Sequence, residues 1–145
     1  MIYIFDIDGT LADLSQRLHL IQSQPPDWEA FFMASGADQP IWDIITIARA
    51  LRQGSTIILS SGRAEKSRAI TVAWMNKYRV LFDALYMRKD GDHREDNVVK
   101  SELLDQILAK YPGIPIAGIF EDRQQVVDMY RARGFRVLQV AKGDF

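Results

Sequence analysis

Five short apolar runs alternate with segments of helical periodicity, and this alternation restricts the class of fold more than any other feature of the sequence. The apolar runs are 2–5, 55–60, 83–87, 114–120 and 135–140, and the helical segments are 41–53, 64–78, 98–110 and 123–133. Strands that alternate with helices of this length predict right-handed β-α-β units and a parallel sheet covered on both faces. We therefore predict one three-layer, Rossmann-like α/β domain over residues 1–145, with about five parallel strands.

The segment from about residue 15 to residue 39 does not follow this alternation. It contains two consecutive prolines and three aromatic residues, Trp28, Phe31 and Phe32. We predict two short helices inserted after the first strand, either as a small lid beside the strand ends or as a packed hairpin without a functional role. Trp28 either stacks on a base or packs in the core, and we expect the core. Trp42 and Trp74 fit apolar helix faces and are also expected in the core.

Composition and charge exclude several classes of function. Of the 145 residues, 48% are hydrophobic and 26% are charged, as in an ordinary globular protein. The net charge of −1 argues against a broad basic surface, although not against a small basic pocket. The absence of cysteine excludes disulfides, thiolate metal sites and a cysteine nucleophile. With no apolar run of membrane-spanning length and no signal-peptide pattern, we expect a cytoplasmic protein with no membrane partner.

Polar and charged residues follow three of the predicted strands. The first strand leads into Asp6-Ile7-Asp8-Gly9-Thr10, the second into Ser60-Ser61-Gly62-Arg63 and the fourth into Glu121-Asp122-Arg123. In an open parallel sheet, ligands bind beyond the carboxyl ends of the strands. Because buried carboxylates cost free energy, the acids at these ends either cap the next element or take part in chemistry.

This set of groups suits phosphoryl transfer to an aspartate. Asp6 is able to attack phosphorus while Asp8 handles protons, and a positioned general acid contributes about 10²–10⁴-fold to such a step. The carboxylate of Asp6 and the phosphate are both negative and repel each other. Mg²⁺ held by carboxylates would offset this repulsion. Ser61 and backbone N–H groups would hold phosphate oxygens, and Lys100 would neutralise the charge that develops.

The motifs resemble those of the haloacid-dehalogenase-like (HAD) phosphohydrolases. DIDGT resembles the first motif of that family, DxDGT, and SSGR, Lys100 and ED supply the second, third and fourth motifs in order. Further residues restrict the resemblance to one branch of this family. They are Arg17, Arg63, the stretch REDNVVK and the C-terminal tail ending in AKGDF. Over nearly the whole chain, the sequence is similar to the 3′-phosphatase domain of phage polynucleotide kinase/phosphatase. No GxxxxGK[ST] motif occurs, so the kinase half is absent from this sequence.

The resemblance implies a role for each matching residue. Asp6 would be the nucleophile, Asp8 the acid/base, and Lys100 a third catalytic residue. Mg²⁺ would be bound by Asp6, the backbone carbonyl of Asp8, Asp122 and Glu121, the last either directly or through water. Phosphate and substrate would be held by Ser61, Gly62, Arg17, Arg63 and Asp96. From its spacing, Asp96 is also able to cap the helix and to orient Lys100.

Structural roles compete with several of these assignments. In the structural interpretation, Asp6 and Asp8 only form a turn, and Ser61 and Asp122 only cap helices. Lys100 is then a solvated helix residue, and Lys89 is the alternative lysine for the site. Ser60 is likewise the alternative to Ser61 as the serine that binds phosphate. Arg17 and Arg63 would form ordinary surface ion pairs.

We predict a Mg²⁺-dependent phosphatase that removes a 3′-phosphate from DNA ends, RNA ends or nucleotides through an aspartyl-phosphate. A nucleotidase or small-molecule phosphatase acting on free mononucleotides needs the same motifs. A binding module that has kept the fold without catalysis is the alternative from another class. A homo-oligomer, a separate kinase partner and activity on 2′,3′-cyclic phosphates are all compatible with the sequence.

Overall fold

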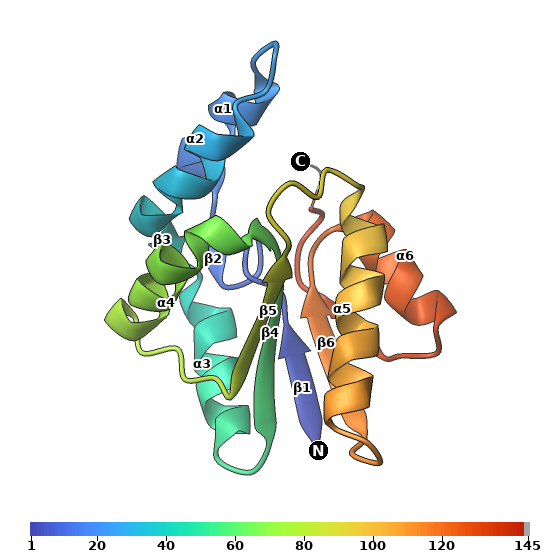
Figure 1. The fold of residues 1–145 in the computed structure, drawn as a ribbon. Helices are drawn as coiled ribbons and strands as arrows, with labels where there is room; N and C mark the ends of the chain where they lie inside the picture. Colours follow the sequence, from blue (N-terminus) through green and yellow to red (C-terminus); the bar gives the residue numbers. More distant parts are fainter. Residues whose placement is uncertain (144–145) are drawn as a thin grey trace.

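A parallel sheet forms the centre of the molecule. The computed structural model of the chain describes residues 1–143, and within them five parallel strands form one sheet in the order β5-β4-β1-β6-β7 (Figure 1). The strands are β1 (Ile2–Phe5), β4 (Thr56–Ala64), β5 (Ala84–Arg88), β6 (Ile116–Glu121) and β7 (Val137–Gln139). The predicted fold class is confirmed. Since the chain leaves β1 first toward β4 and later returns to β6, the strand order reverses beside β1, which is where such sheets bind ligands.

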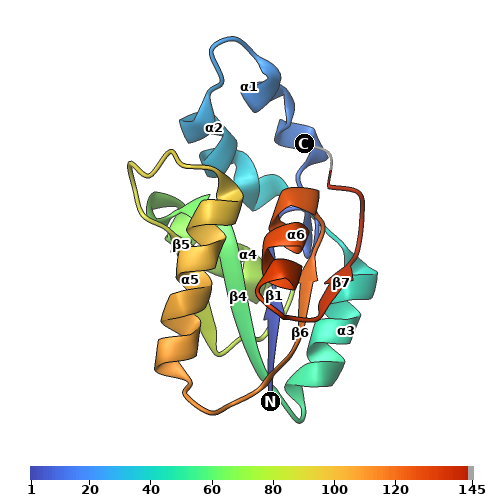
Figure 2. The same ribbon diagram turned by 90° about the vertical axis from the view of Figure 1, so that its right-hand side faces the viewer.

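Four helices cover the two faces of the sheet. On one face lie α3 (Trp42–Arg52) and α4 (Arg68–Lys77), and on the other lie α5 (Asp96–Lys110) and α6 (Gln124–Ala132) (Figures 1 and 2). The boundaries differ from the prediction at two starts. A 3₁₀ turn, Glu65–Ser67, precedes α4, and α5 begins two residues before the expected Val98.

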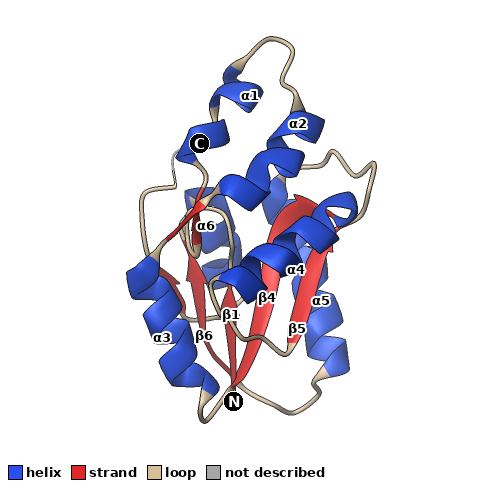
Figure 3. Cartoon of the chain, turned by 90° about the vertical axis from the view of Figure 1, so that its left-hand side faces the viewer, coloured by secondary structure: helices blue, strands red, loops and turns tan. Residues whose placement is uncertain are grey.

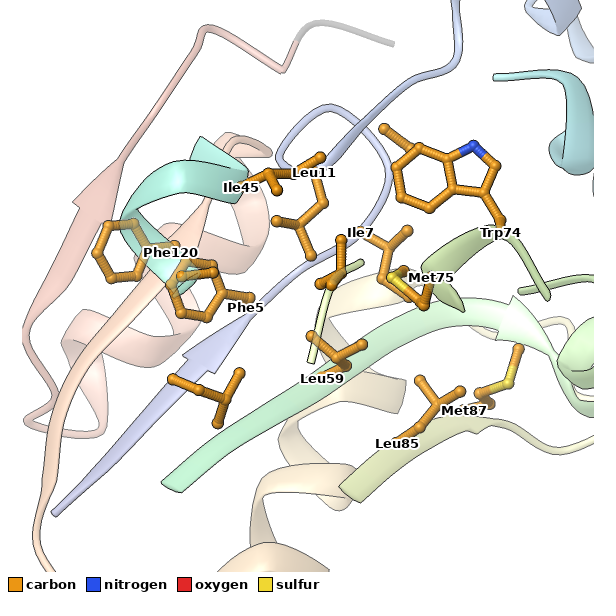
Figure 4. Packing of buried hydrophobic residues seen from close by; sticks show 14 residues of the cluster. Phe5, Ile7, Leu11, Ile45, Leu59, Trp74, Met75, Leu85, Met87 and Phe120 are labelled. Atoms are coloured by element: carbon orange, nitrogen blue, oxygen red, sulfur yellow. The ribbon is translucent and has the colours of Figure 1, made fainter. Parts of the chain in front are cut away.

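Side chains of each strand alternate between two cores. Phe5 and Phe120 stack at 4.3 Å between ring centroids, on the face that Trp74 of α4 also covers (Figure 4). Ile4 points to the opposite face, where it packs in a cluster with Leu104 of α5. Because both faces are covered, the strands read as continuous apolar runs, and for this reason they were visible in the sequence.

The three tryptophans differ in their burial. Trp74 is buried, as predicted, and its indole N–H donates to the backbone carbonyl of Asp38 at 2.8 Å. The predictions for Trp42 and Trp28 are wrong, because their side chains are 52% and 46% exposed. Each is the first residue of its helix, and periodicity identifies an apolar face without showing whether that end of the helix is covered.

The segment after β1 contains the two predicted short helices. They are α1 (His19–Gln22) and α2 (Trp28–Met33), flanked by 3₁₀ turns at Ser15–Arg17 and Ala34–Ala37. A short antiparallel pair, β2 (Ala12–Asp13) with β3 (Gln39–Pro40), closes the segment at its base. This pair was not predicted, since strands of two residues show no alternation. Together α1 and α2 stand beyond the carboxyl ends of the strands (Figure 3). Among residues 1–143, no helix has the length and apolar character needed to cross a bilayer.

The turn after β1 approaches the end of β6 closely. Gly9 has a φ of +84°, and a Cβ atom added there would lie 2.1 Å from Oδ2 of Asp122. Backbone bonds fix this turn, because the Gly9 N–H donates to the Ala12 carbonyl and the Leu11 N–H donates to that of Ile7, both at 2.8 Å. Only glycine meets both the conformational and the steric requirement.

We expect Gly9→Ala to destabilise the protein more than Gly91→Ala. Gly91 also has a positive φ, +81°, but an added Cβ would meet nothing within 4 Å. The free energy of unfolding of the Gly91 variant should fall only by the cost of a left-handed non-glycine residue, about 1–2 kcal/mol. That of the Gly9 variant should fall by this amount and by the further cost of moving Asp122. Urea unfolding of both variants measures the difference, and equal losses would contradict the close approach.

Candidate active site

A buried lysine joins the ends of β1 and β6. Phe5 is paired with Phe120, so the next residues, Asp6 and Glu121, lie side by side where these strands end. Lys100 extends from α5 and donates to Oδ1 of Asp6 at 2.6 Å and to Oε2 of Glu121 at 2.7 Å. All three side chains are buried. Lys100 is therefore not a solvated helix residue, and the exposed Lys89 does not replace it.

Three carboxylates form a cluster with the composition of a metal site. Each of Asp6, Glu121 and Asp122 offers an oxygen within 4.8 Å of the others. The buried Oδ1 of Asp122 has no hydrogen-bond partner among the described residues. Oxygen ligands of this kind are those that Mg²⁺ prefers, and a buried oxygen without a partner is suited to a cation. The residues present thus fit a Mg²⁺ ion.

The charge of this cluster is only partly balanced. Burial raises the pKa of Asp6 well above its ordinary value, the negative charges of Glu121 and Asp122 raise it further, and Lys100 only partly opposes them. Burial likewise raises the pKa of Glu121 to about 7, although Lys100 acts in the opposite direction. Burial alone would lower the pKa of Lys100, but Asp6 and Glu121 outweigh it and raise that pKa, so Lys100 stays charged. A bound cation would restore the ionised form of the acids.

Asp8 belongs to a separate network of charges. Its Oδ1 accepts from Nη2 of Arg17 and from Nη2 of Arg63, each at 2.6 Å. Burial would raise the pKa of Asp8, but Arg63 and Arg17 outweigh it and lower that pKa. Both arginines are fully buried, so the surface ion pairs that competed with a site role are ruled out.

Asp38 completes this network, and sequence reasoning missed it. Its Oδ1 accepts from Nε of Arg17 at 2.9 Å, and its Oδ2 accepts from Nη2 of Arg17 at 2.8 Å and from Nη2 of Arg63 at 3.3 Å. Its side chain is completely buried. Two acids thus face two arginines, and the network is neutral when all four are ionised. Asp38 lies just before β3 and follows no predicted strand, so no positional signal marked it.

Arg88 holds the end of β5 to the neighbouring loops. Its Nε donates to the Gly62 carbonyl at 2.8 Å, and its Nη2 lies 3.3 Å from Oδ1 of Asp96. Oδ2 of Asp96 lies 3.6 Å from Nζ of Lys100. The expectation that Asp96 caps the helix is wrong, because Glu95 occupies the N-cap position and Asp96 is the first helical residue. Asp96 contacts Lys100 one helical turn away instead. An added Cβ on Gly62 would lie 2.1 Å from Asp96 Oδ1, so this approach requires glycine.

Ser60 and Ser61 are both buried residues of β4, on opposite faces of the strand. Oγ of Ser61 accepts from the Arg63 N–H at 3.1 Å. Helix capping explains neither Ser61 nor Asp122, since Ser67 and Arg123 occupy the N-cap positions of α4 and α6. Residues 144 and 145 of the C-terminal motif lie outside the described residues.

A cavity of about 780 Å³ opens above these groups. Its lining includes the predicted residues Asp6, Asp8, Gly62, Asp96, Lys100, Glu121 and Asp122. Ser60, Ser61, Arg17 and Arg63 are not among the lining residues, and the two arginines contact Asp8 instead. Two segments wall the cavity on either side, α1 with α2 and the loop before α5. The volume is far larger than a phosphate group, so the cavity has room for a larger ligand.

Comparison with known proteins agrees with this geometry. The model of the polynucleotide kinase PNKP phosphatase domain, a HAD family, matches residues 1–145. Two solved structures of the Pnkp1/Rnl/Hen1 complex, one described as an RNA repair complex, contain chains that are 33% and 34% identical to this one, with TM-scores of 0.84 and 0.82. The matches cover 99% of this chain but only 43% and 46% of those chains. This chain therefore spans less than half the length of these relatives.

More distant structures share the fold. A phosphatase-like protein from Clostridium difficile is 15% identical with a TM-score of 0.69, over 95% of this chain and 83% of that one. A haloacid dehalogenase-like hydrolase from Streptococcus pneumoniae is 16% identical with a TM-score of 0.67, over the same shares. At this identity the likeness concerns the fold alone. The match over all 145 residues, together with the cluster at the strand ends, shows that the chain belongs to the HAD-type phosphatase domain family of polynucleotide kinase/phosphatases.

Proposed function

We propose that this HAD phosphatase removes a terminal 3′-phosphate from nucleic acid in a Mg²⁺-dependent reaction through an aspartyl-phosphate. The observation that carries the proposal is the contact of Asp6 with Lys100 inside a three-carboxylate cluster, on the wall of an open cavity. The family supports phosphatase chemistry, and the RNA repair complex of its relatives supports a nucleic-acid substrate.

The proposed chemistry has two displacement steps. A carboxylate oxygen of Asp6 attacks phosphorus, the bond from phosphorus to the 3′ oxygen breaks, and that oxygen takes a proton from Asp8. Asp8 then removes a proton from water, whose oxygen attacks phosphorus and breaks the bond to Asp6. Inorganic phosphate leaves and Asp6 is restored. Lys100 opposes the negative charge that gathers on the phosphoryl oxygens in both steps.

The contacts of the carboxylates suggest how each one would hold Mg²⁺. Oδ1 of Asp122 is without a partner among the described residues, which favours direct ligation. Oε2 of Glu121 accepts from Lys100, and its Oε1 accepts the N–H groups of Asp122 and Arg123, each at 3.1 Å. Because Glu121 accepts three hydrogen bonds, two of them from backbone N–H groups, we propose that it acts through water. Asp6 and the backbone carbonyl of Asp8 would complete the protein ligands. When bound, Mg²⁺ would reduce the repulsion between Asp6 and the phosphate.

The neutral network around Asp8 would set when this acid holds a proton. Arg17 and Arg63 favour its ionised form, which suits removal of a proton from water. Asp38 shares both arginines and so limits their effect on Asp8. A phosphate dianion beside Asp8 would raise the pKa of Asp8 and favour protonation before the first step.

We also propose that residues 15–39 act as one wall of the site within a single phosphatase domain. The relatives come from the Pnkp1/Rnl/Hen1 complex, which supports a further part of the proposal, that this domain acts together with a separate kinase or another repair partner. The cytoplasmic location and a homo-oligomeric state stay predictions from the sequence.

Replacing the nucleophile should abolish turnover. We expect Asp6→Asn to lower phosphate release by several orders of magnitude, each tenfold corresponding to about 1.4 kcal/mol of activation free energy. The measurement is phosphate release from a 3′-phosphorylated oligonucleotide, a 3′-mononucleotide and a 5′-mononucleotide, with circular dichroism as the check on folding. The wild-type protein should act on the 3′-phosphorylated substrates.

Two results would contradict the proposal. Undiminished release by folded Asp6→Asn protein would remove Asp6 as the nucleophile. Cleavage of only the 5′-mononucleotide by the wild type would favour a nucleotidase, and no cleavage of any substrate in the presence of Mg²⁺ would favour a binding module.

Mg²⁺ should be required and should bind more tightly as the pH rises. Burial raises the pKa of Glu121 to about 7 and that of Asp6 above its ordinary value, so the metal-free cluster holds protons that Mg²⁺ must displace. We expect EDTA to abolish activity, and the apparent Mg²⁺ affinity to increase from about pH 6 to pH 8. Isothermal titration at several pH values tests this. Full activity in EDTA would exclude the metal, and an affinity independent of pH would contradict the raised pKa values.

Loss of the negative charge of Asp38 should impair proton transfer by Asp8. In Asp38→Asn, Arg17 and Arg63 face Asp8 alone, so the pKa of Asp8 should fall and less of it should be protonated near neutral pH. We expect kcat to fall about 10- to 100-fold, a part of the contribution of a general acid, and the alkaline limb of the pH–rate profile to move to lower pH. Asp43→Asn, at an exposed acid of α3, is the control. An unshifted profile would refute the coupling.

A further inference from the structure

One wall of the cavity is apolar and aromatic, in contrast to its charged floor. Leu18, at the N-cap of α1, and the helices α1 and α2 themselves form it, the latter through Ile21, Trp28, Phe31 and Phe32. Trp28 is 46% exposed although it lines the cavity, whereas Phe31 is buried. None of these residues has a part in the proposed phosphoryl transfer. The exposure of aromatic side chains in this wall therefore needs another explanation. The wall lines the same cavity as Asp6 and Lys100.

The contacts of Trp28 leave much of its indole ring open. Trp28 is perpendicular to Phe31 at 5.8 Å between centroids and is tilted by 31° to Phe32 at 6.1 Å. These are tilted or edge contacts, and among the described residues no aromatic ring stacks parallel on Trp28. An exposed aromatic face inside a cavity is able to accept another flat ring.

The wall is connected directly to the catalytic acid. The guanidinium of Arg17 lies 4.2 Å from the centroid of the Phe31 ring, and its Nη1 donates to the Phe31 carbonyl at 3.2 Å. The same guanidinium donates to Asp8 at 2.6 Å. Trp28 packs on Phe31, so its position relative to Asp8 is set by a short chain of contacts. A ring stacked on Trp28 would thus be held at a defined place relative to the reacting phosphate.

The lining also contains cationic side chains, and most of them are paired with acids. Lys66, Arg88, Arg94 and Arg123 line the same cavity. Arg88 donates to Asp96, and Arg94 is paired with Asp92 and Glu102. The side chain of Lys66 is 42% exposed, and its Nζ lies 4.0 Å from Oε1 of Glu29 on α2. An exposed aromatic surface with a cationic side chain near it is a pattern by which proteins bind single-stranded nucleic acid, where bases stack and the backbone meets positive charge.

We propose that Trp28, supported by Phe32, forms a stacking platform for the nucleobase of the 3′-terminal nucleotide. This inference rests on the proposed function and names its substrate class, a 3′-phosphate that carries a base beside it. Every base has a π face, so the platform would accept all four bases and would distinguish nucleotides from phosphomonoesters without a base.

The test compares two oligonucleotides of the same length with a 3′-terminal phosphate. In one, the terminal residue is a normal nucleotide, and in the other it is an abasic tetrahydrofuran residue. We expect Trp28→Ala to lower kcat/KM on the normal end about 10- to 100-fold and to leave kcat/KM on the abasic end unchanged. Trp28→Phe, which keeps an aromatic face, should retain most of the activity. Met33→Ala, at a residue of α2 that is 48% exposed and outside the cavity lining, is the matched control and should behave as the wild type.

Two outcomes of this comparison would overturn the inference. The first is an equal loss on both ends in Trp28→Ala, which would indicate a structural role for the indole. The second is a wild-type protein that cleaves normal and abasic ends with the same kcat/KM, in which case the proposed function stands and the platform does not.

A binding measurement separates the two proposals. Stacking should quench tryptophan fluorescence when a nucleoside 3′-monophosphate is added to Asp6→Asn protein, inorganic phosphate should not, and Trp28→Phe in this background should remove the quenching. If neither oligonucleotide loses its phosphate, the proposed function fails, and quenching that depends on Trp28 would still support the platform. Absence of quenching in the presence of bound nucleotide would overturn it.

Discussion

The packing of the site and the proposed chemistry both require the contact of Lys100 with Asp6 and Glu121. It joins α5 to the ends of β1 and β6 through bonds of 2.6 and 2.7 Å between buried groups. Removing one partner of a buried ion pair typically costs about 3–5 kcal/mol, because the other charge is left uncompensated. The same lysine keeps a negative charge tolerable at Asp6, so the fold and the proposed chemistry share one device.

Around this contact the site divides into two electrostatic parts. Asp6, Glu121 and Asp122 outnumber Lys100, and the resulting excess of negative charge leaves a place for a cation. Asp8 instead lies in a balanced network with Arg17, Arg63 and Asp38. Two aspartates separated by one residue thus have different environments, one suited to bind a metal and attack phosphorus, the other suited to exchange protons.

Much of the fold and part of the site could be predicted because they follow local rules. A strand buried on both faces has a continuous apolar sequence, and the residue after it lies at the ligand-binding edge of a parallel sheet. From these rules we could locate the strands of the sheet and predict that Asp6, Asp8 and Glu121 lie at one edge of it. The predictions for residues at helix starts were wrong. Asp96 was expected to cap a helix, and Trp28 and Trp42 were expected in the core.

The class of fold, the order of the motifs and the acids at the strand ends are readable from the sequence alone, since periodicity and chain position encode them. The folded structure was needed to show that Asp38 balances two arginines, that Arg88 holds Gly62 and Asp96, and that Trp28 lines the cavity. Asp8, Asp38 and Arg63 are far apart in the chain, and none of their mutual contacts leaves a periodic signal. The pairing of distant charges is set by how the elements pack, and a single sequence does not record that packing.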